Sequence, residues 1–114
     1  MKISEIVKLL DAKIVCGEEF AEREVERAFA SDLMSDVLTT HFDNGVLITG
    51  LANPQSVRTA DMMDISVILL ARKKRATEEM ISLAQENDAV IIESELSVFR
   101  ICGILFEHGL KPVY

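Results

Sequence analysis

The chain has 114 residues, the usual size of one domain, and we expect a single domain over residues 1–114. Nineteen acidic against twelve basic residues give a net charge of −7, which disfavours nucleic acid as a partner because a phosphate backbone attracts basic surfaces. Charges in the first residues break any signal-peptide pattern, and no apolar run approaches the ~20 residues of a membrane span, so we expect a soluble, cytoplasmic protein.

The first part of the chain predicts one helix and two strands. Apolar residues recur at helical spacing over residues 3–10, with Ser4 as the N-cap. Residues 13–16 are β-branched in part and end at a glycine, and residues 25–30 repeat this signature after an acidic segment. We therefore expect strands at both places.

A second helix and the clearest strand follow. Ser31 and Asp32 precede residues 33–42, whose apolar side chains fall on one helical face behind these capping groups. Residues 46–49 form a continuous apolar run, and Asn53 then supplies the N-cap of a helix with proline at its first position. This segment predicts a strand, a turn and a helix in succession.

The strand–helix pattern then repeats twice. Residues 67–70 are a second apolar run, followed by a basic loop and by a helix that begins at Thr77. Residues 89–92 are the third run, and Ser94 caps a last helix that ends near Gly109. Because parallel strands buried on both faces read as unbroken apolar runs, we predict an α/β fold with one mostly parallel sheet of about four or five strands, flanked by helices.

No segment carries recognisable catalytic machinery. A phosphate loop is absent, and Gly50 stands alone where a dinucleotide site needs three spaced glycines. No paired acid and base can be singled out among the carboxylates. The spacing of His41, His108, Cys16 and Cys102 matches no compact zinc site, and the two cysteines read as buried hydrophobes. We expect no catalytic residue, no metal and no cofactor.

Polar residues gather where the predicted strands end. Ligands of parallel α/β sheets bind outside the carboxyl ends of the strands, where loops and helix N-termini converge. Helix capping alone explains Ser31, Asn53 and Ser94, but not the other hydroxyl and amide groups of the set. The candidate ligand-binding residues are Ser31, Asp32, Ser35, Thr49, Gly50, Asn53, Gln55, Arg72 and Ser94.

We expect any ligand of this edge to be polar or anionic. The helix that starts near Pro54 presents unpaired backbone N–H groups there. Asp32 and Asp36 would repel a bare polyphosphate, so a nucleoside monophosphate fits better. The basic run at residues 72–75 has two interpretations, a solvated loop screened by the glutamates that follow it or an anion site.

The last helix is apolar on two sides. Its stripes are Leu96, Phe99, Gly103 and Phe106 on one side and Val98, Ile101, Cys102 and Leu105 on the other. One stripe can cover the sheet, whereas the other would leave an exposed apolar patch unless a second subunit hides it. We predict a homodimer whose interface is the second stripe.

Three stretches of the sequence, residues 30–40, 45–74 and 84–110, together resemble a DRTGG domain in its stand-alone form. The most specific part is the segment 31–36 followed by 47–50, and residues 58–61 add weight. DRTGG domains are similar to the N-terminal domain of HPr kinase/phosphorylase, and others sit beside CBS domains in pyrophosphatases. The resemblance implies a regulatory or dimerising role, while HPr kinase activity is not expected because the phosphate-loop domain is missing.

Two classes of function remain open. The first is a non-catalytic regulatory or ligand-sensing domain that dimerises, binds a small polar or nucleotide ligand, or docks on a larger metabolic or redox enzyme. The second is a small enzyme with its site at the carboxyl edge of the sheet. The missing nucleophile–base pair favours the first class.

Overall fold

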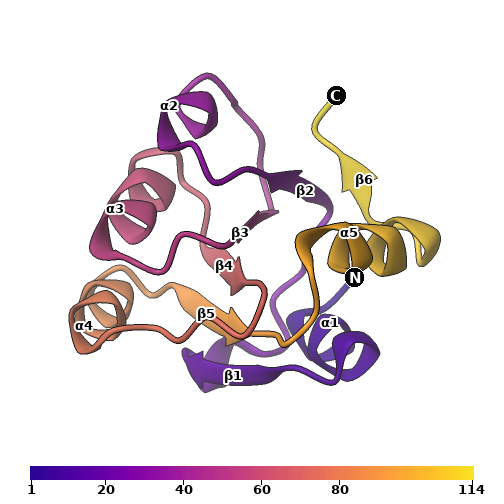
Figure 1. The fold of residues 1–114 in the computed structure, drawn as a ribbon, viewed down its shortest axis with the longest axis horizontal. Coiled ribbons are helices and arrows are strands. Elements are labelled where there is room, and N and C mark those ends of the chain that lie inside the picture. The colour runs from indigo at the N-terminus through magenta and orange to yellow at the C-terminus, as the bar shows by residue number, and fades with distance from the viewer.

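The strands form one six-stranded sheet in the order β1-β5-β4-β3-β2-β6, with helices on both faces (Figure 1). The computed structural model describes residues 1–114. Its elements are α1 (Ile3–Leu10), β1 (Lys13–Cys16), the 3-10 turn η1 (Glu18–Phe20), β2 (Arg27–Ala30), α2 (Met34–Val37), β3 (Gly45–Thr49), α3 (Pro54–Met62), β4 (Val67–Leu70), α4 (Glu78–Glu86), β5 (Val90–Glu93), α5 (Val98–Glu107) and β6 (Lys111–Pro112). None of the helices has the length and apolar character to cross a bilayer.

The predicted parallel sheet is confirmed. Strands β2, β3, β4 and β5 run parallel in register, and β6 pairs in parallel with β2. Strand β1 pairs antiparallel with β5 and closes the other edge. The sheet thus has one strand more than expected, because β6 contains only Lys111 and Pro112 and leaves no apolar run in the sequence.

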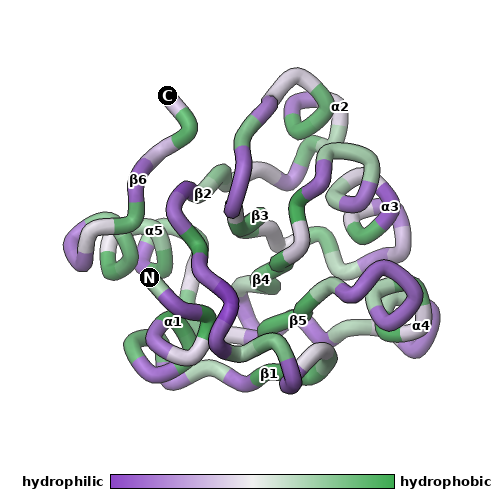
Figure 2. The backbone as a smooth tube through the Cα atoms, turned by 180° about the vertical axis from the view of Figure 1, so that it is seen from behind, coloured by the Kyte–Doolittle hydropathy of each residue, from purple (hydrophilic) through white to green (hydrophobic).

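Two apolar cores lie on the two faces of the sheet, and alternate residues of each central strand enter one or the other. Val46 and Ile48 of β3 pack toward α1 and α5, whereas Leu47 packs toward α2, α3 and α4. All residues of β3 and β4 are buried, which explains their unbroken apolar sequence. Figure 2 shows the contrast between the green, apolar central strands and the purple, polar turns at the periphery.

Two of the predicted helix starts in the first half are wrong. Helix α1 has Lys2 rather than Ser4 as its N-cap, and the Glu5 carboxylate accepts the Lys2 backbone N–H at 3.1 Å. Helix α2 begins after Leu33 without any side-chain cap and has four residues, not the expected ten. The hydroxyls of the next two threonines donate to the carbonyls of Asp36 and Val37, at 2.7 and 2.6 Å, and these local bonds replace the next helical turn.

Helix α5 begins later than predicted. The stripe that was predicted to face a second subunit packs against the sheet instead. Ser97, not Ser94, is the N-cap, and its hydroxyl accepts the backbone N–H of Arg100 at 3.2 Å. Ile101 and Leu105, which the sequence analysis placed at a dimer interface, are 0% and 1% exposed and pack against the sheet.

The exposed side of α5 is the other stripe. Phe99 and Phe106 are 90% and 68% exposed. The remaining two residues of the predicted interface, Val98 and Cys102, are half-buried beside the core. The two free thiols, Cys16 and Cys102, both have a raised pKa because burial disfavours the thiolate.

Candidate functional site

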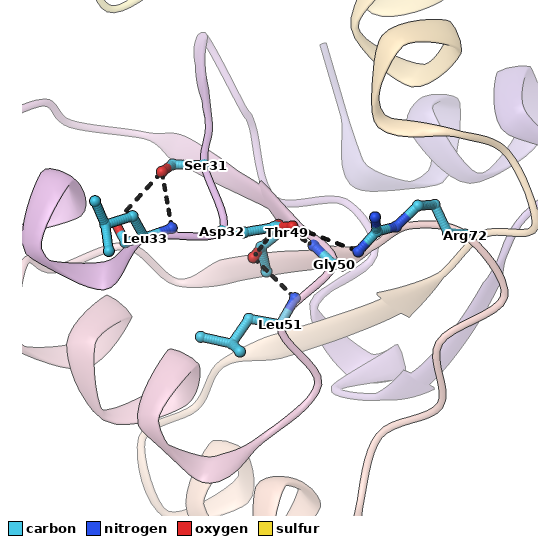
Figure 3. Close-up of polar contacts among 7 residues, drawn as sticks. All are labelled: Ser31, Asp32, Leu33, Thr49, Gly50, Leu51 and Arg72. Carbon is cyan, nitrogen blue, oxygen red and sulfur yellow. Dashed lines mark hydrogen bonds and ion pairs between the residues drawn. The ribbon is translucent and has the colours of Figure 1, made fainter.

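Three loops converge at the carboxyl edge of the sheet on one ionic and hydrogen-bonded cluster (Figure 3). Asp32 follows β2, Thr49 and Gly50 end β3, and Arg72 follows β4. One oxygen of the Asp32 carboxylate, Oδ1, accepts the Gly50 backbone N–H at 2.6 Å and the Thr49 hydroxyl at 3.1 Å. The other oxygen, Oδ2, lies 3.4 Å from a guanidinium nitrogen of Arg72. The edge therefore brings together four of the nine candidate residues.

Two donors of this cluster, the Thr49 hydroxyl and the Gly50 N–H, are fixed at the end of β3, whereas the side chains of Asp32 and Arg72 reach over it from other loops. Thr49 is completely buried, and its hydroxyl also accepts the backbone N–H of Leu51 at 3.1 Å. The side chains of Asp32 and Arg72 are about half exposed, at 52% and 50%. A Cβ at Gly50 would overlap the Arg72 guanidinium, so the absence of a side chain at this position lets the arginine lie over the strand end. This contact gives Thr49 and Gly50 the structural role that the sequence did not reveal.

The other candidate residues are used within their own loops or face solvent. The Ser31 hydroxyl accepts the Leu33 N–H at 3.0 Å, and Asn53 caps α3 by accepting the Ser56 N–H at 3.4 Å. Ser94 is buried in the turn before α5. Ser35 and Gln55 are exposed and make no side-chain hydrogen bond within the chain, so their amide and hydroxyl groups are free.

The topological switch point of the sheet lies between β4 and β5, at the end of the predicted set where Arg72 and Ser94 lie. The connection after β4 leads to α4 on one face, and the connection after β5 leads to α5 on the other. The loop after β4 spans this crevice, since the N–H groups of Arg72 and Lys73 donate to the carbonyls of Leu96 and Ser94 at 2.8 and 3.0 Å. Both donors have a positive φ, 59° and 64°. The crevice is thus bridged by the basic loop.

The four basic residues of that loop divide into two paired and two free groups. Arg72 pairs with Asp32, and Arg75 lies 3.6 Å from Glu93. Of the two glutamates that follow the loop, Glu79 pairs with Arg58 and not with a residue of the basic run. The two lysines between the arginines are exposed and form no ion pair, and they supply the positive charge of this edge.

A second concave surface lies on the opposite side of β2. It is an open, mainly apolar groove of about 350 Å³ between α5 and the strands β2 and β6. The side chains of Phe99 and Phe106 border it, Cys102 forms part of its wall, and Lys111 is its one charged group. No three histidine, cysteine, aspartate or glutamate side chains lie close enough together to hold a metal ion.

Comparison with known proteins places this geometry in a family. The fold is similar to the crystal structure of the CBS and DRTGG domains of the regulatory region of Clostridium perfringens pyrophosphatase, complexed with its activator diadenosine tetraphosphate. The TM-score is 0.73 at 16% sequence identity over 98% of this chain, and the match spans 48% of that protein's chain, about half its length. A search of curated proteins gave no significant match. The sequence profile of the DRTGG domain matches residues 5–107, which confirms the resemblance noted in the sequence, and the chain belongs to the DRTGG domain family.

Proposed function

We propose that this domain is a non-catalytic regulatory module that binds a small polar ligand, such as a nucleotide, at the carboxyl edge of its sheet. The observation that carries the proposal is the cluster of Asp32, Thr49, Gly50 and Arg72, which joins three loops at the edge where parallel α/β sheets bind ligands. The fold neighbour supports it, because that protein is a regulatory region bound to a nucleotide activator.

The geometry of the cluster disfavours the alternative, a small enzyme. The Thr49 hydroxyl donates to a carboxylate, an arrangement that in an enzyme could activate a nucleophile. Here the hydroxyl is buried and engaged by Asp32 and the Leu51 N–H, so it is closed to a substrate as long as Asp32 stays in place. Both oxygens of the carboxylate are already engaged, one by the Gly50 N–H and the Thr49 hydroxyl and the other by Arg72, so neither is free to accept a proton from a substrate.

The free groups around the cluster define the class of ligand. Lys73, Lys74 and Arg72 offer positive charge, while Gln55 and Ser35 offer groups that can both donate and accept hydrogen bonds. A nucleoside monophosphate satisfies both kinds of group, with its phosphate toward the basic loop and its sugar or base toward the amide and hydroxyl.

The test is a thermal-shift screen of adenine and guanine nucleotides, followed by calorimetry on any hit. A ligand at about 100 times its dissociation constant should stabilise the fold by about 2.7 kcal/mol. Arg72→Met and Gln55→Ala should each weaken binding. Arg27→Met, which removes the same charge at the amino end of β2, should leave it unchanged. If no nucleotide shifts the melting temperature, the domain is a docking or dimerisation module instead.

For dimerisation, we propose that the interface is the exposed stripe of α5, in place of the stripe predicted from the sequence. Gly103 lies between Phe99 and Phe106 at helical spacing, and nothing lies within 4 Å of a Cβ built on it. A second copy crossing α5 at this glycine could approach closely and place each Phe99 in the other copy's groove, which gives a two-fold, self-complementary contact. We infer that the occupant of the groove is a second copy of this chain.

A further inference from the structure

We propose that Asp32 is an internal plug: its carboxylate occupies the anion site of the domain and must leave before the phosphate group of a ligand can bind. The proposal rests on the ligand-binding function above and specifies the groups that hold the phosphate. These are the backbone N–H of Gly50, the hydroxyl of Thr49 and the guanidinium of Arg72.

The set of donors around Asp32 has the composition of an anion site. A backbone N–H, a hydroxyl and a guanidinium all point at one carboxylate, and the Leu51 N–H lies directly behind them on the Thr49 hydroxyl. Oxyanions of carboxylates and phosphates use the same donors, and arginine contacts both in the same way. A phosphate in place of the carboxylate could therefore keep all three contacts (Figure 3).

The two sides of the cluster differ in how firmly they are held. Thr49 and Gly50 end a central strand, and the backbone of Arg72 is tied to Leu96. Asp32 lies between β2 and the four-residue helix α2, and its side chain is 52% exposed, so it can turn into solvent without disturbing the sheet. Helix α2 stays packed through the buried Met34 and Val37, so displacement of Asp32 would free the loop between β2 and α2, and this change gives the domain a signal that a partner could read.

The test compares Asp32→Ala with a matched control in the protein as it stands. Asp36→Ala removes the same charge from an exposed position of the neighbouring helix α2, where the carboxylate makes no hydrogen bond or ion pair. The probes are orthophosphate and adenosine monophosphate, each titrated against ¹⁵N-labelled protein and followed at the Gly50 amide. We expect Asp32→Ala to bind the probes at least about tenfold more tightly than wild type, because a competing charge at contact distance is gone. Asp36→Ala should change the affinity less than about twofold by screening alone.

Asp32→Asn is a second variant that keeps the test valid if Asp32→Ala fails to fold. Its amide oxygen can still accept the Gly50 N–H but carries no charge, so the gain in affinity should be intermediate. The proposal fails if neither Asp32 variant gains affinity over Asp36→Ala, or if the gain occurs without any movement of the Gly50 resonance. Failure of the proposed function looks different: wild type would then bind no nucleotide in the screen while Asp32→Ala still takes up phosphate at Gly50.

Discussion

At the scale of single residues, two glycines meet very different neighbours. A Cβ at Gly50 would contact the guanidinium of Arg72, the far end of a flexible side chain that can move aside. A Cβ at Gly17 would lie 2.8 Å from the carbonyl oxygen of Ala89 and 2.9 Å from a methyl group of Val90. Gly17 also has a φ of +85°, a conformation that L-residues adopt only with strain. Gly17 therefore needs to be glycine, because both its backbone conformation and its close neighbours disfavour a side chain.

We expect Gly17→Ala to lower the free energy of unfolding by about 2–3 kcal/mol, the sum of backbone strain and of overpacking against β5. Gly109→Ala is the matched control, because Gly109 also has a positive φ, +103°, but open space around it. The control should cost only about 1 kcal/mol. Urea unfolding followed by circular dichroism gives both values, and equal losses would show that the contact with Ala89 carries no energy.

At this scale, the sequence predicts which residues belong to the site but not how they contact one another. The separate groups were predictable, since Asp32, Thr49, Gly50 and Arg72 each follow a predicted strand. Their contacts were not, because they join residues 17 to 40 positions apart on three different loops. The sequence also does not indicate the positive φ of Arg72, the conformation that takes the basic loop across the switch point. Asparagine and aspartate are enriched in this conformation and arginine is not, so Arg72 carries no local sequence signal for it.

At the scale of elements, burial decided which predictions succeeded. The central strands were predicted within about one residue because both of their faces are covered, and this leaves an unmistakable apolar run. Helix starts were less predictable where several capping residues compete. Ser94 and Ser97 both precede α5, and only the structure shows that Ser97 is the cap. Helix α2 was overpredicted because its threonines bond to the carbonyls that a longer helix would use.

Thr77, where the sequence predicts the start of a helix, is the N-cap of α4 and offers a clear test of capping. Its hydroxyl accepts the backbone N–H of Met80 at 3.1 Å at the start of α4. Thr77→Ala should lower the free energy of unfolding by about 1 kcal/mol, because that N–H loses its partner. Thr77→Ser keeps the hydroxyl and should restore most of the loss. A serine variant as unstable as the alanine variant in urea unfolding would assign the effect to the lost methyl group instead.

At the scale of the whole molecule, two different surfaces lie on two sides of one sheet. Charged and polar groups gather at the carboxyl edge, whereas the exposed aromatic stripe and the apolar groove lie beside β2 and β6. The strand β2 runs between them, since Asp32 follows its carboxyl end and Ala28 and Ala30 line the groove. The proposed displacement of Asp32 thus has a short route to the proposed dimer contact on α5.

The proposed dimer should become stronger as the salt concentration rises, whereas an interface held by ion pairs becomes weaker. Each copy carries a net charge of −7, so two copies repel, while the contact itself is the apolar stripe of Phe99 and Phe106. Raising the salt concentration from about 0.01 M to about 1 M shortens the Debye length from about 30 Å to about 3 Å and removes this repulsion. Light scattering should therefore show a mass that rises with salt from near 12.7 kDa toward twice that value.

The matched variants identify the surface that forms the dimer. Phe99→Ser with Phe106→Ser should keep the chain monomeric at every salt concentration without unfolding it, because both rings are mainly exposed. Leu33→Ser, at a side chain 58% exposed beside α2, should leave the association intact. A dimer that weakens as salt rises would instead be held by ion pairs, and a dimer that survives the double serine variant would use another face. Either result would leave the groove beside α5 without its proposed occupant.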